Sequence, residues 1–293
     1  MRRYDYTGPD DLRAMQFLVR RLWPHSYQGH AGNLAWSRFQ HTGREGEWRT
    51  SLWADGDTVA AWAWTYDDGT IEICTDPAYP ELAAEVLAWS QAAWPGVQRH
   101  SVEILQSAGH LSAALLTAGF TPADTSGIVM ARLHHNLENL ADPVVPGGFT
   151  LRHAQPGDEG RWAAVHQSAF APSRVTEESI GNVWSAWPFE HRFAWLAEAP
   201  DGSFGAYVIG WYDEVSRVGE FEPVGVREDL QRQGLGRAVC LAALHAFRAA
   251  GAEHAVVYCR ADDGYPAPAA LYTAIGFEEY DRTETYENRR LAD

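Results

Sequence analysis

The sequence is poor in cysteine and has no long hydrophobic run. Its 293 residues include three cysteines, Cys74, Cys240 and Cys259, without close pairs, and this excludes a disulfide framework or a zinc ribbon. No apolar stretch approaches the roughly 20 residues that a membrane-spanning helix needs. The opening MRRYDYTGPDD has no apolar core after its basic residues, so a secretory signal is not expected. These absences predict a cytoplasmic protein without a membrane partner.

Basic residues are also scarce relative to acidic ones. The chain has 23 Lys and Arg against 39 Asp and Glu, which gives a formal net charge of -16. Most of such a surface would repel a phosphate backbone, so nucleic acid is not an expected partner. A cationic small molecule or an amine would instead be attracted to it. The hydrophobic share of 46% and the aromatic share of 12% are those of a packed globular protein.

The chain repeats a set of landmarks, and the turn-rich stretch ADPVVPGGF separates the two copies. Each half has a hairpin pattern around an Asp-Gly turn, SLWADGDTVAAWAW in the first and FAWLAEAPDGSFGAYVIGW in the second. AALLTAGF near the end of the first half matches AALYTAIGF in the second. Alternating strands and helices predict an α/β fold. The predicted organisation is a first domain at 1–140, a linker at 141–148 and a second domain at 149–293.

The stretch GVREDLQRQGLGRAV carries the clearest functional signal. It joins the strand-like GEFEPVGV to a helix predicted over 235–250, whose apolar residues recur at spacings of three and four. A glycine loop before a helix exposes backbone N–H groups at the positive end of the helix dipole, so it binds anions. Gly234 and Gly236 would let the backbone approach a pyrophosphate closely. Arg232 and Arg237 would neutralise its charge.

The loop pattern distinguishes among phosphate ligands. Gln231-x-x-Gly234-x-Gly236 lacks the third glycine of a dinucleotide fingerprint and the Gly-Lys-Ser/Thr of a P-loop. It resembles the Gln/Arg-x-x-Gly-x-Gly/Ala loop of the GNAT N-acetyltransferase superfamily, which binds the pyrophosphate of coenzyme A. The preceding EPVGV and the later AALYTAIGF extend this resemblance from about Phe149 to Tyr286. The duplicated layout is similar to that of tandem members such as mycothiol synthases.

This resemblance implies two tandem acyl-CoA N-acyltransferase folds, each a mixed, mostly antiparallel sheet flanked by helices. It implies acetyl-CoA as co-substrate, no metal, and direct attack by the amine in a ternary complex. A backbone N–H at Val224 would stabilise the oxyanion, and Gly225 and Val226 would bind the pantetheine arm. Tyr265 stands where many members have a pantetheine-binding asparagine, so that contact is lost or altered. The residues implied at the pyrophosphate are Gln231, Arg232, Gln233, Gly234, Leu235, Gly236 and Arg237.

Three side chains are candidates for acid–base chemistry. A primary amine has a pKa of about 10, so a base must remove its proton before attack. Glu220 and Glu222 share one face in a regular strand, and the resemblance favours Glu220, with Glu222 as the second choice. Tyr272 matches the tyrosine that many members place near the coenzyme sulfur, where it would protonate the thiolate. Because Pro223 has no N–H, we also expect a bulge in this strand.

The first half lacks the glycine loop and the residues that correspond to Glu220 and Tyr272, so we expect a GNAT-like fold without catalysis there. Thr70 stands in place of Glu220, and the letters AYPE replace the glycine loop. Leu116 stands in place of Tyr272. The predicted activity is acetyl transfer by the second half to a primary amine, of a small molecule or, alternatively, of a protein or peptide. A non-catalytic CoA-binding regulatory protein is a further alternative, and the sequence allows a homodimer without fixing the oligomeric state.

Overall fold

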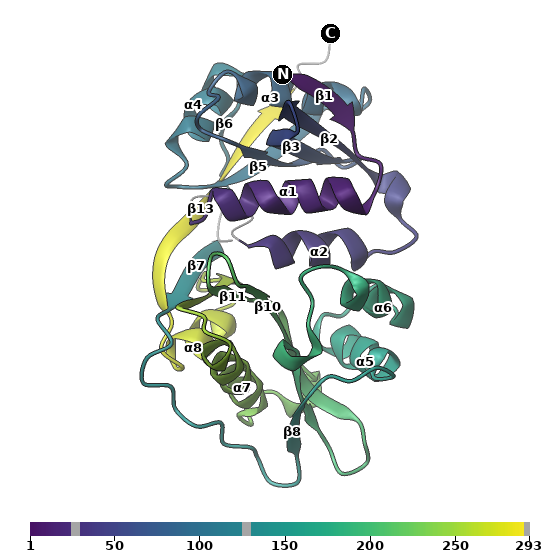
Figure 1. The fold of residues 1–293 in the computed structure, drawn as a ribbon, viewed down its shortest axis with the longest axis vertical. Coiled ribbons are helices and arrows are strands. Elements are labelled where there is room, and N and C mark those ends of the chain that lie inside the picture. The colour runs from purple at the N-terminus through teal and green to yellow at the C-terminus, as the bar shows by residue number, and fades with distance from the viewer. Residues whose placement is uncertain (25–29, 125–129, 290–293) are drawn as a thin grey trace. The chain divides into compact units, whose positions relative to one another are not determined.

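The computed structural model describes residues 1–24, 30–124 and 130–289, and the chain divides into two compact units (Figure 1). Each unit is a sheet flanked by helices that combines antiparallel strand pairs with a parallel pair, as the sequence predicts. Unit 1 comprises Met1–His30, Arg44–Met130 and Asp281–Asp293. Unit 2 comprises Ala31–Gly43 and Ala131–Tyr280.

Unit 1 has the following elements along the chain: β1 (Arg2–Asp5), α1 (Pro9–Arg21), η1 (Glu45–Glu47), β2 (Trp48–Asp55), β3 (Thr58–Tyr66), β4 (Thr70–Thr75), α3 (Leu82–Ala93), β5 (Arg99–Leu105), α4 (Gly109–Thr117), β6 (Thr121–Pro122) and most of β13 (Glu278–Arg289). Its sheet order is β1-β2-β3-β4-β5-β13, with β6 also paired to β13. The predicted hairpin over SLWADGDTVAAWAW is confirmed, because β2 and β3 pair antiparallel around a turn with Gly56 at φ 58°.

Unit 2 has the following elements: α2 (Ala31–Phe39), β7 (Met130–His135), β8 (Thr150–His153), α5 (Glu159–Ala169), α6 (Glu177–Ser185), η2 (His191–Phe193), β9 (Trp195–Glu198), β10 (Phe204–Asp213), β11 (Val218–Val226), η3 (Glu228–Leu230), α7 (Leu235–Ala249), β12 (His254–Arg260) and α8 (Ala267–Thr273). Its sheet order is β7-β12-β11-β10-β9-β8. Helices α7 and α8 lie on one face of the sheet, and α5 and α6 on the other (Figure 1).

The compact units exchange segments relative to the two halves of the sequence. Helix α2 belongs to the first half of the chain but packs in unit 2 against α6, β10 and β11. Strand β7, also from the first half, lies beside β12 in unit 2. Conversely, residues Thr283–Arg289 of β13, at the end of the second half, pair with β5 in unit 1. The ranges 1–140, 141–148 and 149–293 therefore describe the sequence repeat and not the packing units, and they stay a prediction about that repeat.

The helix predicted over 235–250 is α7, and its apolar stripe is buried as the spacing predicts. Leu235, Val239, Leu244 and Phe247 belong to one buried cluster with side chains of β10 and β11. Contact with the sheet is close, because a Cβ built on Gly219 would lie 2.4 Å from Cδ2 of Phe247. This packing fixes α7 against β11 and so places the loop before the helix beside the end of that strand.

Within the described ranges, no helix is both long and apolar enough to cross a bilayer. No cluster of three or more His, Cys, Asp or Glu residues in those ranges could hold a metal ion. Cys74, Cys240 and Cys259 are all buried.

Candidate active site

Strand β11 separates from β12 halfway along its length. The two strands pair in parallel only as far as Phe221 among the pairs described, so β11 is unpaired on that side from Glu222 onward. On its other side, the register with β10 shifts between Phe221 and Val224. The extra residue lies at Glu222-Pro223, where proline cannot donate to a ladder. The bulge expected from Pro223 is therefore present, and it accompanies the opening between β11 and β12.

A cavity of about 530 Å³ lies at this opening. Its walls are the end of β11, the loop before α7, the segment leading into α8, and the end of α5. All the predicted cofactor-binding residues line it except Gln233, whose side chain donates to the backbone oxygen of Asp229. The lining residues are Ala169, Phe170, Val224, Gly225, Val226, Gln231, Arg232, Gly234, Leu235, Gly236, Arg237, Tyr265, Ala267, Pro268, Ala270, Leu271 and Tyr272.

The loop before α7 has the backbone geometry of an anion site. Gly234 is the N-cap of α7 at φ 90°, a conformation that favours glycine, and no side chain caps the helix. The first N–H groups of α7 are thus left without partners inside the helix. Arg232 also has a positive φ, of 61°. Neither Arg232 nor Arg237 forms an ion pair with another described residue, so both can meet a bound anion.

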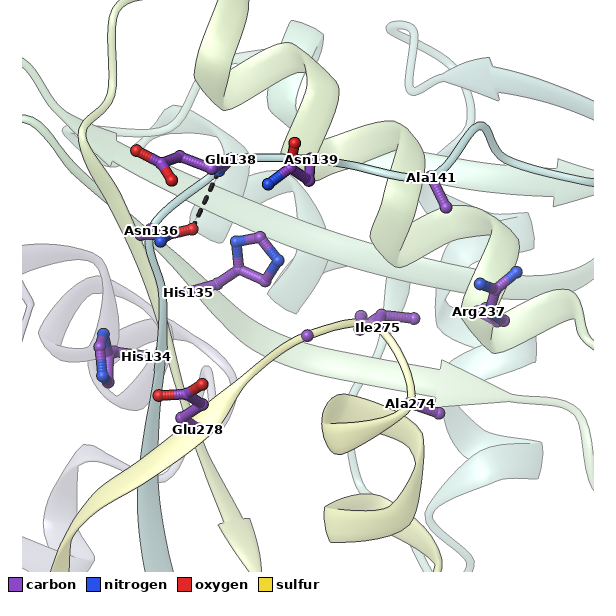
Figure 2. Close-up of a pocket in the computed structure, with 11 residues that line it drawn as sticks. His134, His135, Asn136, Glu138, Asn139, Ala141, Arg237, Ala274, Ile275 and Glu278 are labelled. Carbon is purple, nitrogen blue, oxygen red and sulfur yellow. Dashed lines mark hydrogen bonds between the residues drawn. The ribbon is translucent and has the colours of Figure 1, made fainter.

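A second cavity, of about 350 Å³, shares only Arg237 with the first among its lining residues (Figure 2). Arg237 stands at one end of it, and His134 and Glu278 stand at the other (Figure 2). His135 is buried in its wall, where its Nδ1 accepts a hydrogen bond of 2.7 Å from the backbone N–H of Leu137. This histidine is therefore held by the fold. The cavity contains none of the candidate acid–base residues.

Glu220 and Glu222 lie on β11 and do not themselves line the larger cavity. Glu220 is 1% exposed, whereas Glu222 is partly exposed. Burial raises the pKa of Glu220 well above its usual value, and the charge of Glu222 raises it further. Burial also raises the pKa of Glu222, to about 7. A pair of carboxyl groups with raised pKa values is suited to accepting protons near neutrality.

The two carboxyl groups have different neighbours. Arg132 on β7 and hydrogen bonding from Asn33 on α2 act against burial and lower the pKa of Glu220. Glu222 instead acts on Tyr207 and Tyr272: after burial, its charge contributes to the raised pKa of both phenols. Glu222 is thus electrostatically linked to the tyrosine that lines the cavity, and Glu220 to α2 and β7.

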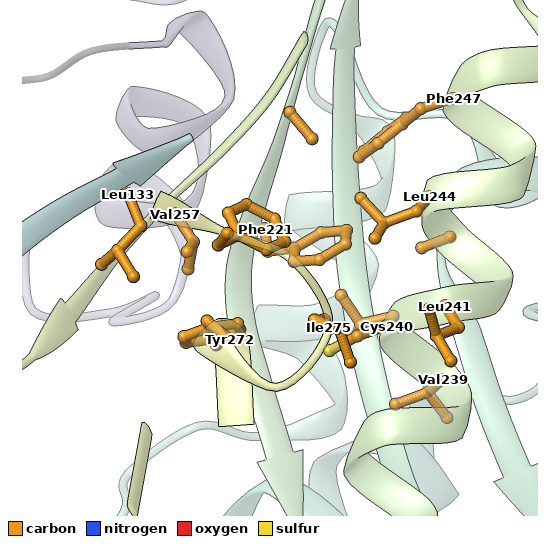
Figure 3. Packing of buried hydrophobic residues seen from close by; sticks show 14 of the residues in the cluster. Leu133, Phe221, Val239, Cys240, Leu241, Leu244, Phe247, Val257, Tyr272 and Ile275 are labelled. Atoms are coloured by element: carbon orange, nitrogen blue, oxygen red, sulfur yellow. The ribbon is translucent and has the colours of Figure 1, made fainter. Parts of the chain in front are cut away.

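Tyr272, on α8, belongs both to the cavity wall and to the buried cluster of unit 2. Figure 3 shows its ring in that cluster, with Phe221, Cys240 and Ile275 around it. Only 5% of the residue is exposed, and burial raises the pKa of its hydroxyl well above 10. The phenol therefore stays protonated across the neutral range and can act as a donor at the cavity.

Sequence reasoning missed the side of the cavity formed by α5. Ala169 and Phe170 line it, and the hydroxyl of Tyr207 hydrogen-bonds to Nδ1 of His166 just behind them. Burial lowers the pKa of His166 to about 4, so its ring is neutral near pH 7. The letters AVHQSAFAPS carry no spacing that would have singled these residues out. Burial by distant strands gives them their properties.

Unit 1 has a smaller cavity at a similar opening, between β4 and β5. Strands β4 and β5 pair in parallel only at Thr70–Ile71, and a cavity of about 310 Å³ lies near the end of β4. Its walls come from the ends of α1 and β4 and from the start of α4. Among the described residues, no glycine lines it, and Leu116 is not one of its lining residues. Within that described part of the chain, the phosphate loop of unit 2 has no counterpart at this cavity.

Residues 162–277 match the model of the Acetyltransferase (GNAT) family. The match runs from α5 to the residue before β13 and includes β11, the glycine loop, α7 and α8. This segment is therefore similar to GNAT acetyltransferases. The loop on which the resemblance was based, and both groups of candidate acid–base residues, lie inside the GNAT match.

Curated relatives matched by the chain are named mycothiol acetyltransferase. The protein of Streptomyces bingchenggensis (strain BCW-1) is 33% identical over 165 residues, which are 50% of this chain and 50% of the relative. The protein of Pseudarthrobacter chlorophenolicus is 26% identical over 253 residues, 80% of this chain and 75% of the relative. The chain spans about half the length of the Streptomyces relatives it matches.

Solved structures extend the likeness to both units. A tandem GNAT protein from the clavulanic acid biosynthesis pathway superposes with a TM-score of 0.65 at 14% identity, over 100% of this chain and 99% of that one. A GCN5-related N-acetyltransferase from Sphaerobacter thermophilus gives 0.62 at 18% identity, over 99% and 97%. At these identities the likeness concerns the fold. It confirms the prediction of two tandem GNAT folds, each with a mostly antiparallel sheet.

Proposed function

We propose that the protein transfers the acetyl group of acetyl-CoA to the primary amine of a small molecule, by direct attack in a ternary complex in unit 2. One observation carries the proposal: a single cavity joins the unpaired edge of β11, the glycine loop at the start of α7, and the hydroxyl-bearing Tyr272. An elongated thioester with a pyrophosphate needs this combination of an extended strand edge and an anion site.

The residues fit acetyl-CoA in two respects. The pyrophosphate would lie on the N–H groups after Gly234, with Arg232 and Arg237 balancing its charge. The pantetheine arm would run along the edge of β11 at Gly225 and Val226 that faces away from β10, where β12 no longer pairs with the strand. The backbone N–H of Val224 is proposed to stabilise the oxyanion, since preorganised donors supply much of the rate enhancement in acyl transfer.

Acid–base roles follow from the buried carboxyl groups and the phenol. In the proposed reaction Glu220 takes a proton from the ammonium group, directly or through water, and the neutral amine then attacks the thioester carbon. The C–S bond breaks, and the thiolate that leaves takes a proton from Tyr272. The second proton lost by the nitrogen as the amide forms returns to the phenolate of Tyr272. Glu222 is the second candidate base, because a pKa of about 7 matches a general base at neutral pH. A cytoplasmic location, as predicted from the sequence, is part of this proposal.

The nature of the acceptor rests on charge and on the relatives. A net charge of -16 attracts cationic amines, and the relatives are named for a mycothiol acetyltransferase activity. We therefore propose a small-molecule acceptor, with amines of the mycothiol type as the first to test.

A thiol-release assay tests the function. Acetyl-CoA and the full chain are incubated with a panel of small-molecule amines, and with peptides that have free N-termini, while CoA release is followed. The chain contains no lysine, so acetylation of its own side-chain amines gives no background. Release that depends on a small amine, and that falls about 10²- to 10⁴-fold in Glu220→Gln, supports the proposal. Release only with peptides would assign a peptide acceptor, and binding of CoA without release would indicate a regulatory protein.

A further inference from the structure

Helix α2 lies directly against the strand pair that carries Glu220. A Cβ built on Gly32 would lie 2.1 Å from Cγ of Trp211, so the helix backbone contacts that indole and only glycine fits there. Trp211 on β10 is in turn the register partner of Glu220 on β11. The residue that follows Gly32 is Asn33, which is therefore held over this cross-strand pair by the packing of its neighbour.

Asn33 has two groups that can donate hydrogen bonds to Glu220, its backbone N–H and its side-chain NH₂. Helix α2 begins at Ala31, so the backbone N–H of Asn33 is among the first four, which have no acceptor within the helix. The side-chain oxygen of Asn33 accepts a hydrogen bond of 3.2 Å from the hydroxyl of Ser37, one turn later. That contact leaves the amide NH₂ group to donate. Hydrogen bonding from the backbone and side chain of Asn33 lowers the pKa of Glu220.

The remaining charges around Glu220 are few. Glu222, on the same strand, raises its pKa, and Arg132 on β7 lowers it. His166 on α5 is kept neutral near pH 7 by its own burial. The N-terminus of α2 adds a positive dipole end next to the carboxylate. Asn33 thus supplies donors to the carboxylate form of a group that burial otherwise drives toward its protonated form.

We propose that Asn33 is a positioning residue, which orients the carboxylate of Glu220 and stabilises its proton-accepting form, so that the first half of the chain completes the active site of unit 2. The catalytic role of Asn33 rests on the function proposed above, in which Glu220 is the base. The interaction between Asn33 and Glu220 does not depend on that function.

The first experiment needs no acceptor. Protein labelled with ¹³C at the glutamate carboxyl carbon is titrated by NMR, with Glu220→Gln used to assign the signal of Glu220. In Asn33→Ala the titration midpoint of Glu220 should rise by about one to two pH units, since a hydrogen bond to a charged group is lost. Asn33→Asp, which keeps the shape of the side chain but replaces the donor by a like charge, should raise it at least as far.

Asn182→Ala is the matched control. Asn182 lies on α6 in the same unit, and its amide donates to the hydroxyl of Thr42 at 3.0 Å, so its loss should leave the titration of Glu220 unchanged. Titration curves of Asn33→Ala and Asn33→Asp that superimpose on the wild-type curve would overturn the proposal. So would an equal shift in Asn182→Ala, because the effect would then be general loosening of the unit.

The second experiment separates this inference from the proposed function. With an active acceptor, the acid limb of kcat against pH should move to higher pH in Asn33→Ala, while the plateau and the KM for acetyl-CoA stay close to wild type. A merely structural role would lower kcat at every pH. If Glu220→Gln keeps wild-type turnover, Glu220 is not the base, and that assignment in the proposed function is wrong. The NMR titration still decides whether Asn33 interacts with Glu220. If Glu220→Gln is impaired but the Asn33 profiles do not move, only this inference fails.

Discussion

Gly236, in the first turn of α7, lies directly against Val226 at the end of β11: a Cβ built on the glycine would be 3.0 Å from Cγ2 of the valine. This contact brings the glycine loop next to the open strand edge. Gly236→Ala should push the two apart by a few tenths of an ångström and weaken CoA binding about tenfold, about 1.4 kcal/mol. Gly181→Ala on α6, where no atom lies within 4 Å of the new Cβ, is the control. Equal dissociation constants by calorimetry for both variants would contradict the assigned loop.

Only one loop in the described chain combines an uncapped helix start with glycine at a positive φ beside a strand-edge cavity, so we expect one CoA per chain. Gly234→Glu should abolish binding, because it adds a negative charge at the phosphate site and a side chain at φ 90°. Gly234→Asn should retain most of it, since asparagine tolerates that conformation. Calorimetry that finds two equivalent CoA sites would show that unit 1 binds the cofactor despite its different loop.

Much of this site could be predicted from the sequence because its chemistry is local. A glycine loop at a helix start presents its N–H groups whatever the rest of the fold does, so Gly234 and Gly236 could be recognised from their place before the helix. Gln231 was assigned from the resemblance to the GNAT loop. Pro223 likewise predicts an interruption in the hydrogen bonds between strands, because proline has no N–H to donate. The periodic stripe of α7 was readable for the same reason, because a helix face is set by residues three and four apart.

Other features depend on contacts between distant segments, and no short pattern encodes them. Asn33 and Glu220 are far apart in the sequence, and their proximity follows from a helix of the first half that packs in unit 2. The exchange of α2, β7 and β13 between the units has the same origin. The raised pKa of Glu222 depends on burial, which the sequence of the strand does not encode.

Burial of Glu222 makes stability depend on pH. Its pKa is about 7 in the folded protein against 4.5 for an unperturbed carboxyl. Below about pH 4.5 the Glu222 carboxyl group is protonated in both states, so its burial does not lower the free energy of unfolding. As the pH rises from there to 7, the carboxyl group ionises in the unfolded chain first, and the free energy of unfolding falls. Glu222→Gln removes this loss. Relative to wild type, the variant should gain on the order of 1–3 kcal/mol between pH 5 and pH 8, a range that allows for the partial exposure of Glu222.

Urea unfolding at pH 5 and pH 8 measures this gain in the free energy of unfolding. The control is Glu228→Gln, which changes an exposed carboxylate in η3. We expect Glu228→Gln to change stability equally at pH 5 and pH 8. A Glu222→Gln variant that behaves like this control would show that the Glu222 carboxyl group is solvated in the folded protein, and its place as second candidate base would lose its physical support.

Tyr272 offers the sharpest contrast between an acid and a core residue. If its hydroxyl protonates the departing thiolate, Tyr272→Phe removes an interaction used mainly in the transition state. Turnover and the specificity constant should then fall together, by about 10²-fold, while CoA binding is unchanged. The defect should shrink with an acyl donor whose thiol is more acidic, because a better leaving group needs less proton assistance.

Packing alone leads to the opposite expectation for the same variant. Phenylalanine fills nearly the same volume in the cluster formed with Cys240 and Ile275, and no hydrogen bond of the Tyr272 hydroxyl to another described residue would be lost. A purely structural tyrosine would therefore tolerate the change with activity almost intact. Because burial keeps the phenol protonated throughout the neutral range, an acid role also predicts that the defect persists across a pH series from 6 to 9. Near-wild-type rates over that series would leave Tyr272 as a core residue and would require another proton donor for the thiolate.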